Sequence, residues 1–153
     1  MIDPKFLNLE IYSIYSAALK LMGFEKQKEV VELSGKIMFL QLKNELNLPN
    51  VKKPADLVIM LIKYFEKVGY FSKGEVEIKG ENELWVHMHG ATCHEAVVKL
   101  KSEGGYPPHF CTTLIFAGLK EMFNIKVELS HLDLGSKKPP YHTVEKWKLT
   151  KIN

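Results

Sequence analysis

The amino-acid sequence indicates an α+β protein, because the spacing of its apolar residues changes part-way along the chain. Up to about residue 68, apolar side chains recur every three to four residues, which is typical of helices that bury one face. Two short segments beyond residue 75 then alternate apolar and polar residues, as half-buried strands do. A further pair of helical segments and a further pair of strands complete the chain. Strands joined by short turns favour an antiparallel sheet with helices packed on it.

The first half of the chain is expected to form three helices. Asp3 is a suitable N-cap for the first, and Gly23 is a suitable stop. Gly35 is a candidate kink within the second. The third would begin with Pro54 at its first position and close at Gly69. The expected helices span residues 4–22, 25–46 and 55–68.

A β-hairpin is expected next, from residues 76–79 and 84–89 around a turn at residues 80–83. Side chains alternate between the two faces of a strand. One face of the second strand would therefore carry Leu84, Val86 and Met88. The other would carry Trp85, His87 and His89.

Two helices and two strands are expected after the hairpin. Thr92 and Glu95 have the spacing of a capping box, which would start a helix running to about Ser102. A second helix would span residues 109–123. The last two strands would span residues 125–129 and 141–149 and complete a four-stranded sheet. Residues 1–153 are expected to form one domain.

Composition and charge narrow the classes of function. The longest uncharged run, residues 104–119, is too short and too broken by prolines for a membrane span, and no secretory leader is recognisable, so a cytoplasmic protein is expected. The 21 basic residues are all lysine. Arginine supplies the planar fork that reads guanine edges, so its absence argues against sequence-specific nucleic-acid binding.

Histidine and cysteine gather in the second half of the chain, which makes a site there worth considering. Cys111 lies near the start of a helix, and His131 and His142 lie at the facing ends of the last two strands. One sulfur and two imidazole nitrogens suit zinc and leave a fourth position open. Candidates for that position are Asp133, His109, Glu128 or water. The alternative is a buried cysteine that serves only as a small apolar residue, with two surface histidines.

A second constellation comprises His87, His89, Cys93 and His94, four metal-ligand types within eight residues. Cys93 would lie in the first turn of a helix, where the helix dipole lowers the pKa of a thiol. The alternative is a solvated strand face followed by an ordinary helix start.

Aromatic side chains form a third candidate, a pocket for an apolar ligand lined by Trp85, Phe116 and Tyr64. Core residues have the same types and spacing, so both interpretations stay open. The sequence contains no glycine-rich phosphate loop, no Gly-x-Ser-x-Gly and no Cys-x-x-Cys.

Residues 93–96, 108–111 and 114–118, together with His131 and His142, resemble the vinyl-4-reductase domain family. Its members include small archaeal and bacterial proteins described as hydrocarbon-binding, a protein of bacteriochlorophyll synthesis, and the sensing domains of phenol- and xylene-responsive activators. Their fold is similar to that of the TRAPP vesicle-tethering subunits. The resemblance covers residues 90–149 by motifs and the first three helices only by element order.

The resemblance implies a zinc site whose first ligand is Cys111. Placing His131 at the family's acidic ligand puts His142 at its last cysteine, but the middle cysteine then falls on Leu134, which cannot bind a metal. The site would then have three ligands completed by water or a neighbour, or no metal at all. An alternative register uses Glu128 as the acidic ligand and His131 after it.

The resulting expectation is a domain that binds a small apolar, aromatic or hydrocarbon-like molecule, with zinc near the pocket. One alternative is a metal-dependent enzyme related to vinyl or tetrapyrrole reductases, with His109 or His94 as proton donor. Another is a dimeric interaction module with a structural metal, since the resemblance implies a homodimer formed through the first helix.

Overall fold

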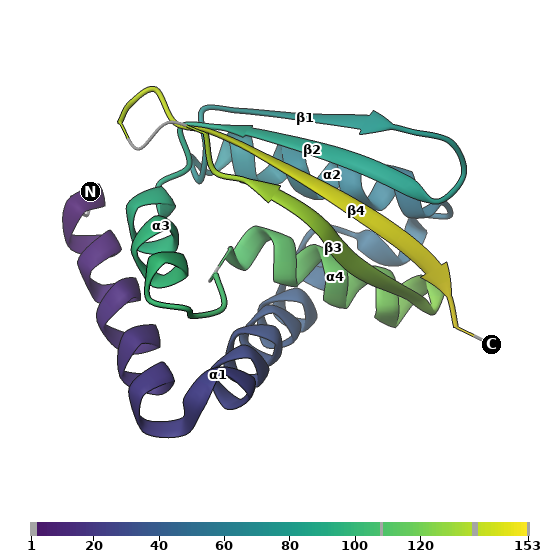
Figure 1. Ribbon diagram of the computed structural model, residues 1–153. Coiled ribbons are helices and arrows are strands. Elements are labelled where there is room, and N and C mark those ends of the chain that lie inside the picture. The colour runs from purple at the N-terminus through teal and green to yellow at the C-terminus, as the bar shows by residue number, and fades with distance from the viewer. Residues whose placement is uncertain (1–2, 108, 136–137, 153) are drawn as a thin grey trace.

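The computed structural model describes residues 3–107, 109–135 and 138–152. Over these residues the chain forms an α+β fold of four α-helices and a four-stranded antiparallel sheet, which confirms the expected class. The strand order is β1-β2-β4-β3. Figure 1 shows the helices gathered on one side of the sheet, while the other side is left uncovered.

Helix α1 (Pro4–Glu45) corrects the expected order of elements, because a single long helix replaces the first two of the three expected helices. It bends at Gly23, whose φ of 78° and ψ of 174° are not helical. The two halves of α1 diverge at this bend (Figure 1). Asp3 caps the helix as expected by accepting a hydrogen bond from the Lys5 backbone N–H at 2.8 Å. Gly35 does not kink the helix but lies against Thr113 of another helix.

A short 3-10 turn, η1 (Leu48–Asn50), leads to helix α2 (Pro54–Lys67). Pro54 occupies the first turn of α2 as expected, where its missing N–H leaves no bond unmade. One face of α2 is buried, and its buried residues are Leu57, Val58, Leu61, Ile62 and Phe65.

The sheet consists of β1 (Lys73–Ile78), β2 (Glu83–His89), β3 (Ile125–Asp133) and β4 (His142–Lys151). The expected faces of β2 are confirmed, since Leu84, Val86 and Met88 are buried against the helices. On β4 the inward residues are Thr143, Glu145 and Trp147. The last two strands pair as neighbours, as expected, with a register shift between Leu129 and His131.

Helices α3 (His94–Ser102) and α4 (Phe110–Phe123) lie between the hairpin and β3. The expected capping box is wrong, because Cys93 is the N-cap of α3 and the Thr92 N–H donates to the Tyr70 carbonyl at 2.9 Å. Glu95 accepts a hydrogen bond from the Tyr141 hydroxyl at 2.7 Å instead. None of the helices among residues 3–107, 109–135 and 138–152 is long and apolar enough to cross a membrane.

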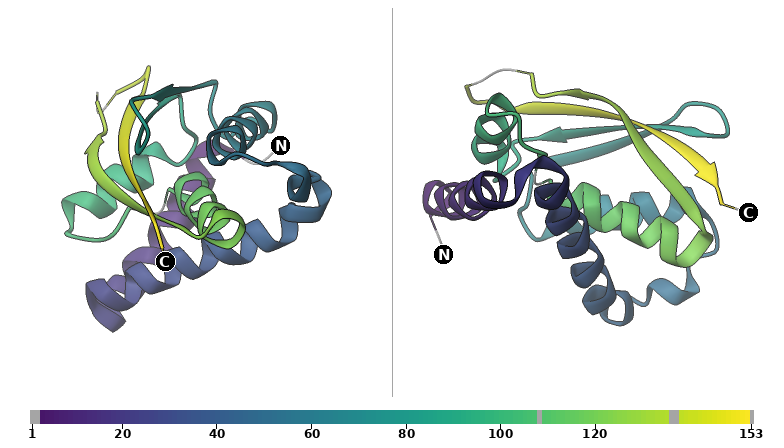
Figure 2. Two further views of the ribbon diagram at one scale, coloured as in Figure 1. Left: turned by 90° about the vertical axis from the view of Figure 1, so that its right-hand side faces the viewer. Right: turned by 60° about the horizontal axis from the view of Figure 1, so that its bottom comes forward.

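Two apolar clusters hold these elements together. The larger one packs α2, α4 and the inner face of the sheet around Phe39 and Trp147. The smaller one joins α1 to α3 around Val31 and Val97. Figure 2 shows the second half of α1 crossing α4, and α1 contributes residues to both clusters.

Candidate functional site

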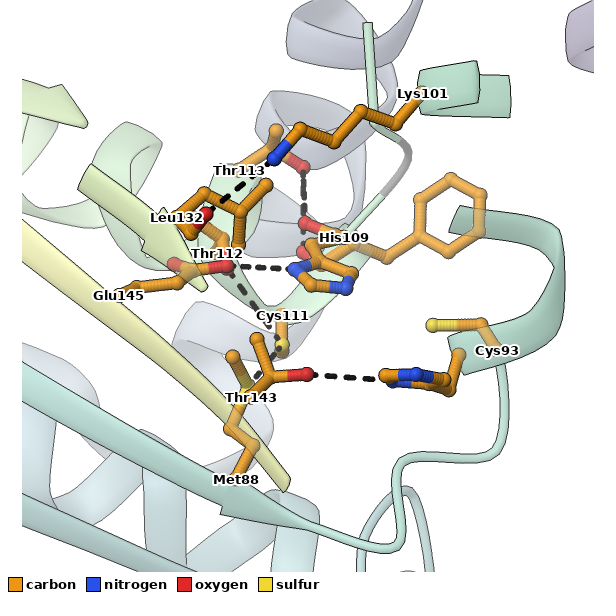
Figure 3. A network of polar contacts seen from close by, with 12 residues as sticks. Met88, Cys93, Lys101, His109, Cys111, Thr112, Thr113, Leu132, Thr143 and Glu145 are labelled. Carbon is orange, nitrogen blue, oxygen red and sulfur yellow. Dashed lines mark hydrogen bonds and ion pairs between the residues drawn. The ribbon is translucent and has the colours of Figure 1, made fainter. Parts of the chain in front are cut away.

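A buried carboxylate lies at the centre of the polar contacts on the inner face of the sheet. Glu145 of β4 has no exposed surface. Its Oε1 accepts a hydrogen bond from His109 Nδ1 at 2.6 Å, and its Oε2 accepts one from Trp147 Nε1 at 2.7 Å. The Thr112 hydroxyl lies 3.0 Å and 2.9 Å from the two oxygens (Figure 3). Three donors from two elements therefore satisfy one buried carboxyl group.

Strand register and helix position together create this arrangement. In β4, Glu145 shares the inward face with Trp147 and lies opposite Val86 of β2. Helix α4 begins beside it, with His109 as N-cap and Thr112 in the first turn. The partial positive charge of a helix N-terminus stabilises a carboxylate placed there. Glu145 therefore fastens the start of α4 to the sheet.

The other ring nitrogen of His109 is buried without a hydrogen-bond partner. A histidine oriented by a carboxylate at Nδ1 and offering Nε2 has the geometry of a general base. Figure 3 shows the His109 ring between Glu145 and Cys93. His109 is only 3% exposed, and it does not line the groove described below. The site is therefore closed to solvent in this structure.

Both cysteines are free, buried thiols near this network. The Cys93 Sγ lies 2.8 Å from the Tyr70 hydroxyl, and the Cys111 Sγ lies 3.6 Å from the Met88 Sδ. Burial raises the pKa of Cys93 to about 11 and raises the pKa of Cys111 well above its ordinary value. The expectation that a helix N-terminus lowers the Cys93 pKa is therefore wrong, because desolvation outweighs the dipole. Both side chains are neutral thiols at neutral pH.

Three imidazoles lie together on the uncovered face of the sheet, and we call them the outer histidine cluster: His87, His89 and His142. His89 lies directly opposite His142 in the β2–β4 pairing, and their rings stack at 4.2 Å between centroids. His87 Nδ1 lies 3.3 Å from His142 Nε2. Desolvation, and then the charges of His89 and His87, lower the pKa of His142. The sequence predicted that His87 and His89 share a strand face, but it did not predict that His142 joins them.

The structure does not bring Cys111, His131 and His142 together. Cys111 lies beneath the inner face of the sheet beside Met88, whereas His142 lies on the outer face. His131 is exposed on β3 opposite Lys146. Within the described part of the chain, no group of three or more His, Cys, Asp or Glu side chains could hold a metal ion. Zinc binding by this chain stays a prediction without an assembled ligand set.

The candidates for the fourth metal ligand are dispersed as well. His109 is paired with Glu145, Glu128 is exposed opposite Lys148, and Asp133 accepts a hydrogen bond from the Gly135 N–H at 2.8 Å.

The second constellation is divided by the sheet. His87 and His89 lie on the outer face, while Cys93 and His94 are buried on the inner side. His94 Nδ1 lies 3.3 Å from the Thr143 hydroxyl, and its ring stacks on Tyr141 at 4.2 Å. The chemistry-bearing residues thus belong to two separate groups.

A surface groove of about 460 Å³ lies between the second half of α1, α4 and β3. Its apolar lining consists of Leu33, Phe116, Ala117, Ile125 and Val127. Of the three aromatic residues expected to bind a ligand, Phe116 lines this groove, and Trp85 and Tyr64 do not. Trp85 lies on the outer face under Lys79 and Lys146, and Tyr64 packs on Phe65.

Sequence reasoning missed the α1 side of the groove and the role of Glu145. The contribution of α1 has no local signal, because Leu33 and Lys36 look like ordinary helix-surface residues. Glu145 had a usable signal, since it has the same parity along β4 as Trp147, a large aromatic residue that favours the buried face.

Comparison of the sequence with protein-family models gives no match, and no curated protein matches it either. The resemblance to the vinyl-4-reductase domain therefore stays a prediction from the motifs, and no family membership is assigned.

Proposed function

We propose that this protein binds a small apolar or aromatic molecule in the groove between α1, α4 and β3. The groove itself is the observation that carries the proposal, because its volume of about 460 Å³ falls within the range of small-molecule sites, roughly 300–1,000 Å³. Its apolar lining offers contact to an uncharged ring or chain. The proposal does not require a metal.

Phe116 is the aromatic contact that such a ligand would meet. Its ring packs edge-on against Trp147 with centroids 5.0 Å apart, so the phenyl group is held by a buried partner. An aromatic side chain held in this way offers a fixed surface at little entropic cost. The groove also has charged neighbours of both signs, which would suit a ligand with one polar end: Glu29, Glu32, Lys36, Lys120, Glu121 and Lys126.

Filling the groove tests the proposal. Ala117→Phe places a ring in the space beside Phe116, and we expect it to weaken binding of the aromatic probe 1-anilinonaphthalene-8-sulfonate at least roughly tenfold, which corresponds to about 1.4 kcal/mol. Fluorescence titration at constant protein concentration measures the change.

The matched control is Ala17→Phe, which adds the same ring at an exposed position on the other half of α1. Probe affinity should be unchanged in this variant. Equal affinities in both variants and the natural protein would show that the probe does not occupy the groove.

A second function, self-association, is favoured by the exposed apolar side chains of the first half of α1. Phe6, Leu9 and Leu21 are 61%, 59% and 85% exposed. At helical spacing these side chains project from one side of the first half of α1, and an exposed apolar helix face suits an interface. We propose that its occupant is a second copy of this chain.

Charge complementarity supports an antiparallel arrangement of two copies. Glu10 and Lys20 are equally distant from Tyr15 along the helix, as are Leu9 and Leu21. Two antiparallel helices whose axes cross at the level of residue 15, on the side of α1 away from the buried Tyr15, would therefore place Glu10 of one protomer opposite the partner's Lys20. The same crossing places Leu9 opposite the partner's Leu21.

Leu21→Glu is expected to convert the dimer to a monomer, because it places a charge opposite an apolar residue. Sedimentation velocity at several protein concentrations measures the change. Leu40→Glu, on the other half of α1, should leave the dimer intact. If the unsubstituted protein sediments as a monomer at all concentrations, the proposed dimer interface is wrong.

A further inference from the structure

The charged side chains around the groove indicate which kind of ligand it would take. Each glutamate of the lining has lysine neighbours outside the groove, whereas two lysines of the lining have no carboxylate partner. We propose that the groove binds an organic anion, an apolar ring or chain with one negatively charged end such as a carboxylate, and that Lys36 and Lys120 hold that end. This inference rests on the proposed function of the groove and names its class of ligand.

Two of the three glutamates, both on α1, are paired with lysines outside the groove. The Lys26 Nζ lies 2.7 Å from a Glu29 carboxylate oxygen, and the Lys28 Nζ lies 3.9 Å from a Glu32 oxygen. Neither Lys26 nor Lys28 is among the residues that line the groove. These lysines therefore offset the negative charge that Glu29 and Glu32 bring to the lining.

The third glutamate, Glu121 of α4, belongs to two hollows of the surface. It lines the groove, and it also lines a second hollow together with Lys43 and Lys52. Neither of these lysines lines the groove. The positive charges that offset Glu121 therefore also lie outside the groove.

Lys36 of α1 and Lys120 of α4 are the positive charges that remain. Both are exposed, and they line the groove from the two helices that enclose it. Among the described residues, neither ammonium group has a carboxylate within ion-pair distance. Lys126 also borders the groove, but it alternates along β3 with Ile125 and Val127, which pack against the core. Strand parity therefore directs Lys126 to the outer face of the sheet.

The positions of the two lysines along their helices place their charges beside the apolar lining. Lys36 follows Leu33 by three residues, and Lys120 follows Phe116 by four, so each pair shares one face of its helix. The flexible stem of a lysine packs along apolar surface while its ammonium group stays in water. A ligand that packs its apolar part on Phe116 therefore has a positive charge within reach of its other end.

Two fluorescent probes that differ by one charged group test the proposal on the full chain. The probe 1-anilinonaphthalene-8-sulfonate carries a sulfonate, and N-phenyl-1-naphthylamine is the same ring system without it. In the double variant Lys36→Gln/Lys120→Gln, we expect affinity for the sulfonate probe to fall about fivefold or more at low salt, because each exposed ion pair contributes up to about fivefold. Affinity for the neutral probe should change by less than about twofold, since glutamine keeps part of the apolar stem.

The matched control is Lys53→Gln/Lys67→Gln, which removes the same net charge from exposed positions at the two ends of α2. Neither residue lines the groove, so both probes should bind this variant as they bind the unsubstituted protein. The inference is wrong if Lys36→Gln/Lys120→Gln keeps its affinity for the sulfonate probe. It is also wrong if that variant loses affinity for both probes equally, or if the control variant loses as much affinity for the sulfonate probe.

Ala117→Phe, which fills the groove, separates this inference from the function on which it rests. If Ala117→Phe weakens binding of both probes while the double lysine variant distinguishes neither, the groove binds apolar molecules without a preference for anions. If Ala117→Phe leaves both affinities unchanged, the probes bind elsewhere, and the proposed function fails together with the inference.

Discussion

Glu145→Ala is expected to lower the free energy of unfolding by about 3–5 kcal/mol, because each buried donor left without an acceptor costs about 1–3 kcal/mol. The substitution leaves three buried donors without an acceptor: His109 Nδ1, the Thr112 hydroxyl and Trp147 Nε1. Domains of this size are commonly stable by only about 5–15 kcal/mol, so the variant would be close to unfolding at room temperature. Urea denaturation followed by circular dichroism measures the change.

Two further variants serve as controls. One keeps a hydrogen-bond acceptor at position 145, and the other removes a carboxylate from an exposed strand position. Glu145→Gln keeps one carbonyl acceptor of similar shape and should cost less than the alanine variant. Glu128→Ala removes an exposed carboxylate from β3 and should change the free energy of unfolding by no more than about 0.5 kcal/mol. If Glu145→Ala and Glu128→Ala are equally stable, the buried network does not hold α4 to the sheet.

Gly35→Ala is expected to destabilise the protein by about 1–3 kcal/mol, the usual cost of overpacking a tight contact. A Cβ at Gly35 would lie 2.5 Å from the Thr113 carbonyl carbon and 2.6 Å from its Oγ1. The close atoms include backbone of α4, so α1 and α4 must separate to make room. The groove lies along this crossing, since Thr113 also lines it. Thermal and urea unfolding measure the loss.

The sign of the Gly35→Ala effect distinguishes packing from intrinsic helix preference. Alanine is favoured over glycine in an exposed helix by about 1 kcal/mol. A stabilised variant would therefore mean that α1 and α4 are not in close contact at this position. Gln41→Ala, on an exposed position of the same helix, serves as the control and should change stability only slightly.

Local patterns in the sequence predicted most of the individual elements. The alternation in β2 correctly separated Leu84, Val86 and Met88 from the outward side chains, because parity along a strand requires no knowledge of the rest of the fold. The pattern at β3 indicated a strand of five residues, whereas the strand has nine. A register shift between Leu129 and His131 interrupts the alternation there, so the period could not be followed further.

The first helix shows where a local signal is ambiguous. Gly23 was expected to end one helix, and its φ and ψ are indeed not helical, but the next helical stretch follows it directly, so α1 is one long helix with a bend at Gly23. Gly35 was expected to kink the helix, because glycine weakens a helix. In the structure its missing side chain instead allows α4 to pack closely against α1. Glycine serves in both ways, and only the neighbouring element distinguishes them.

By itself, the sequence determined the α+β class, the antiparallel pairing and the alternation of faces within β2, because hydrophobic period and turn residues act over short distances. Only the tertiary structure decided which residues meet across the sheet. Helices cover one face, so Cys111 and Glu145 are enclosed beneath it, whereas His142 lies with His87 and His89 on the other face. Which face each residue occupies depends on the strand order and on where α4 packs. Both are set by contacts between residues far apart in the chain, so the local sequence does not predict them.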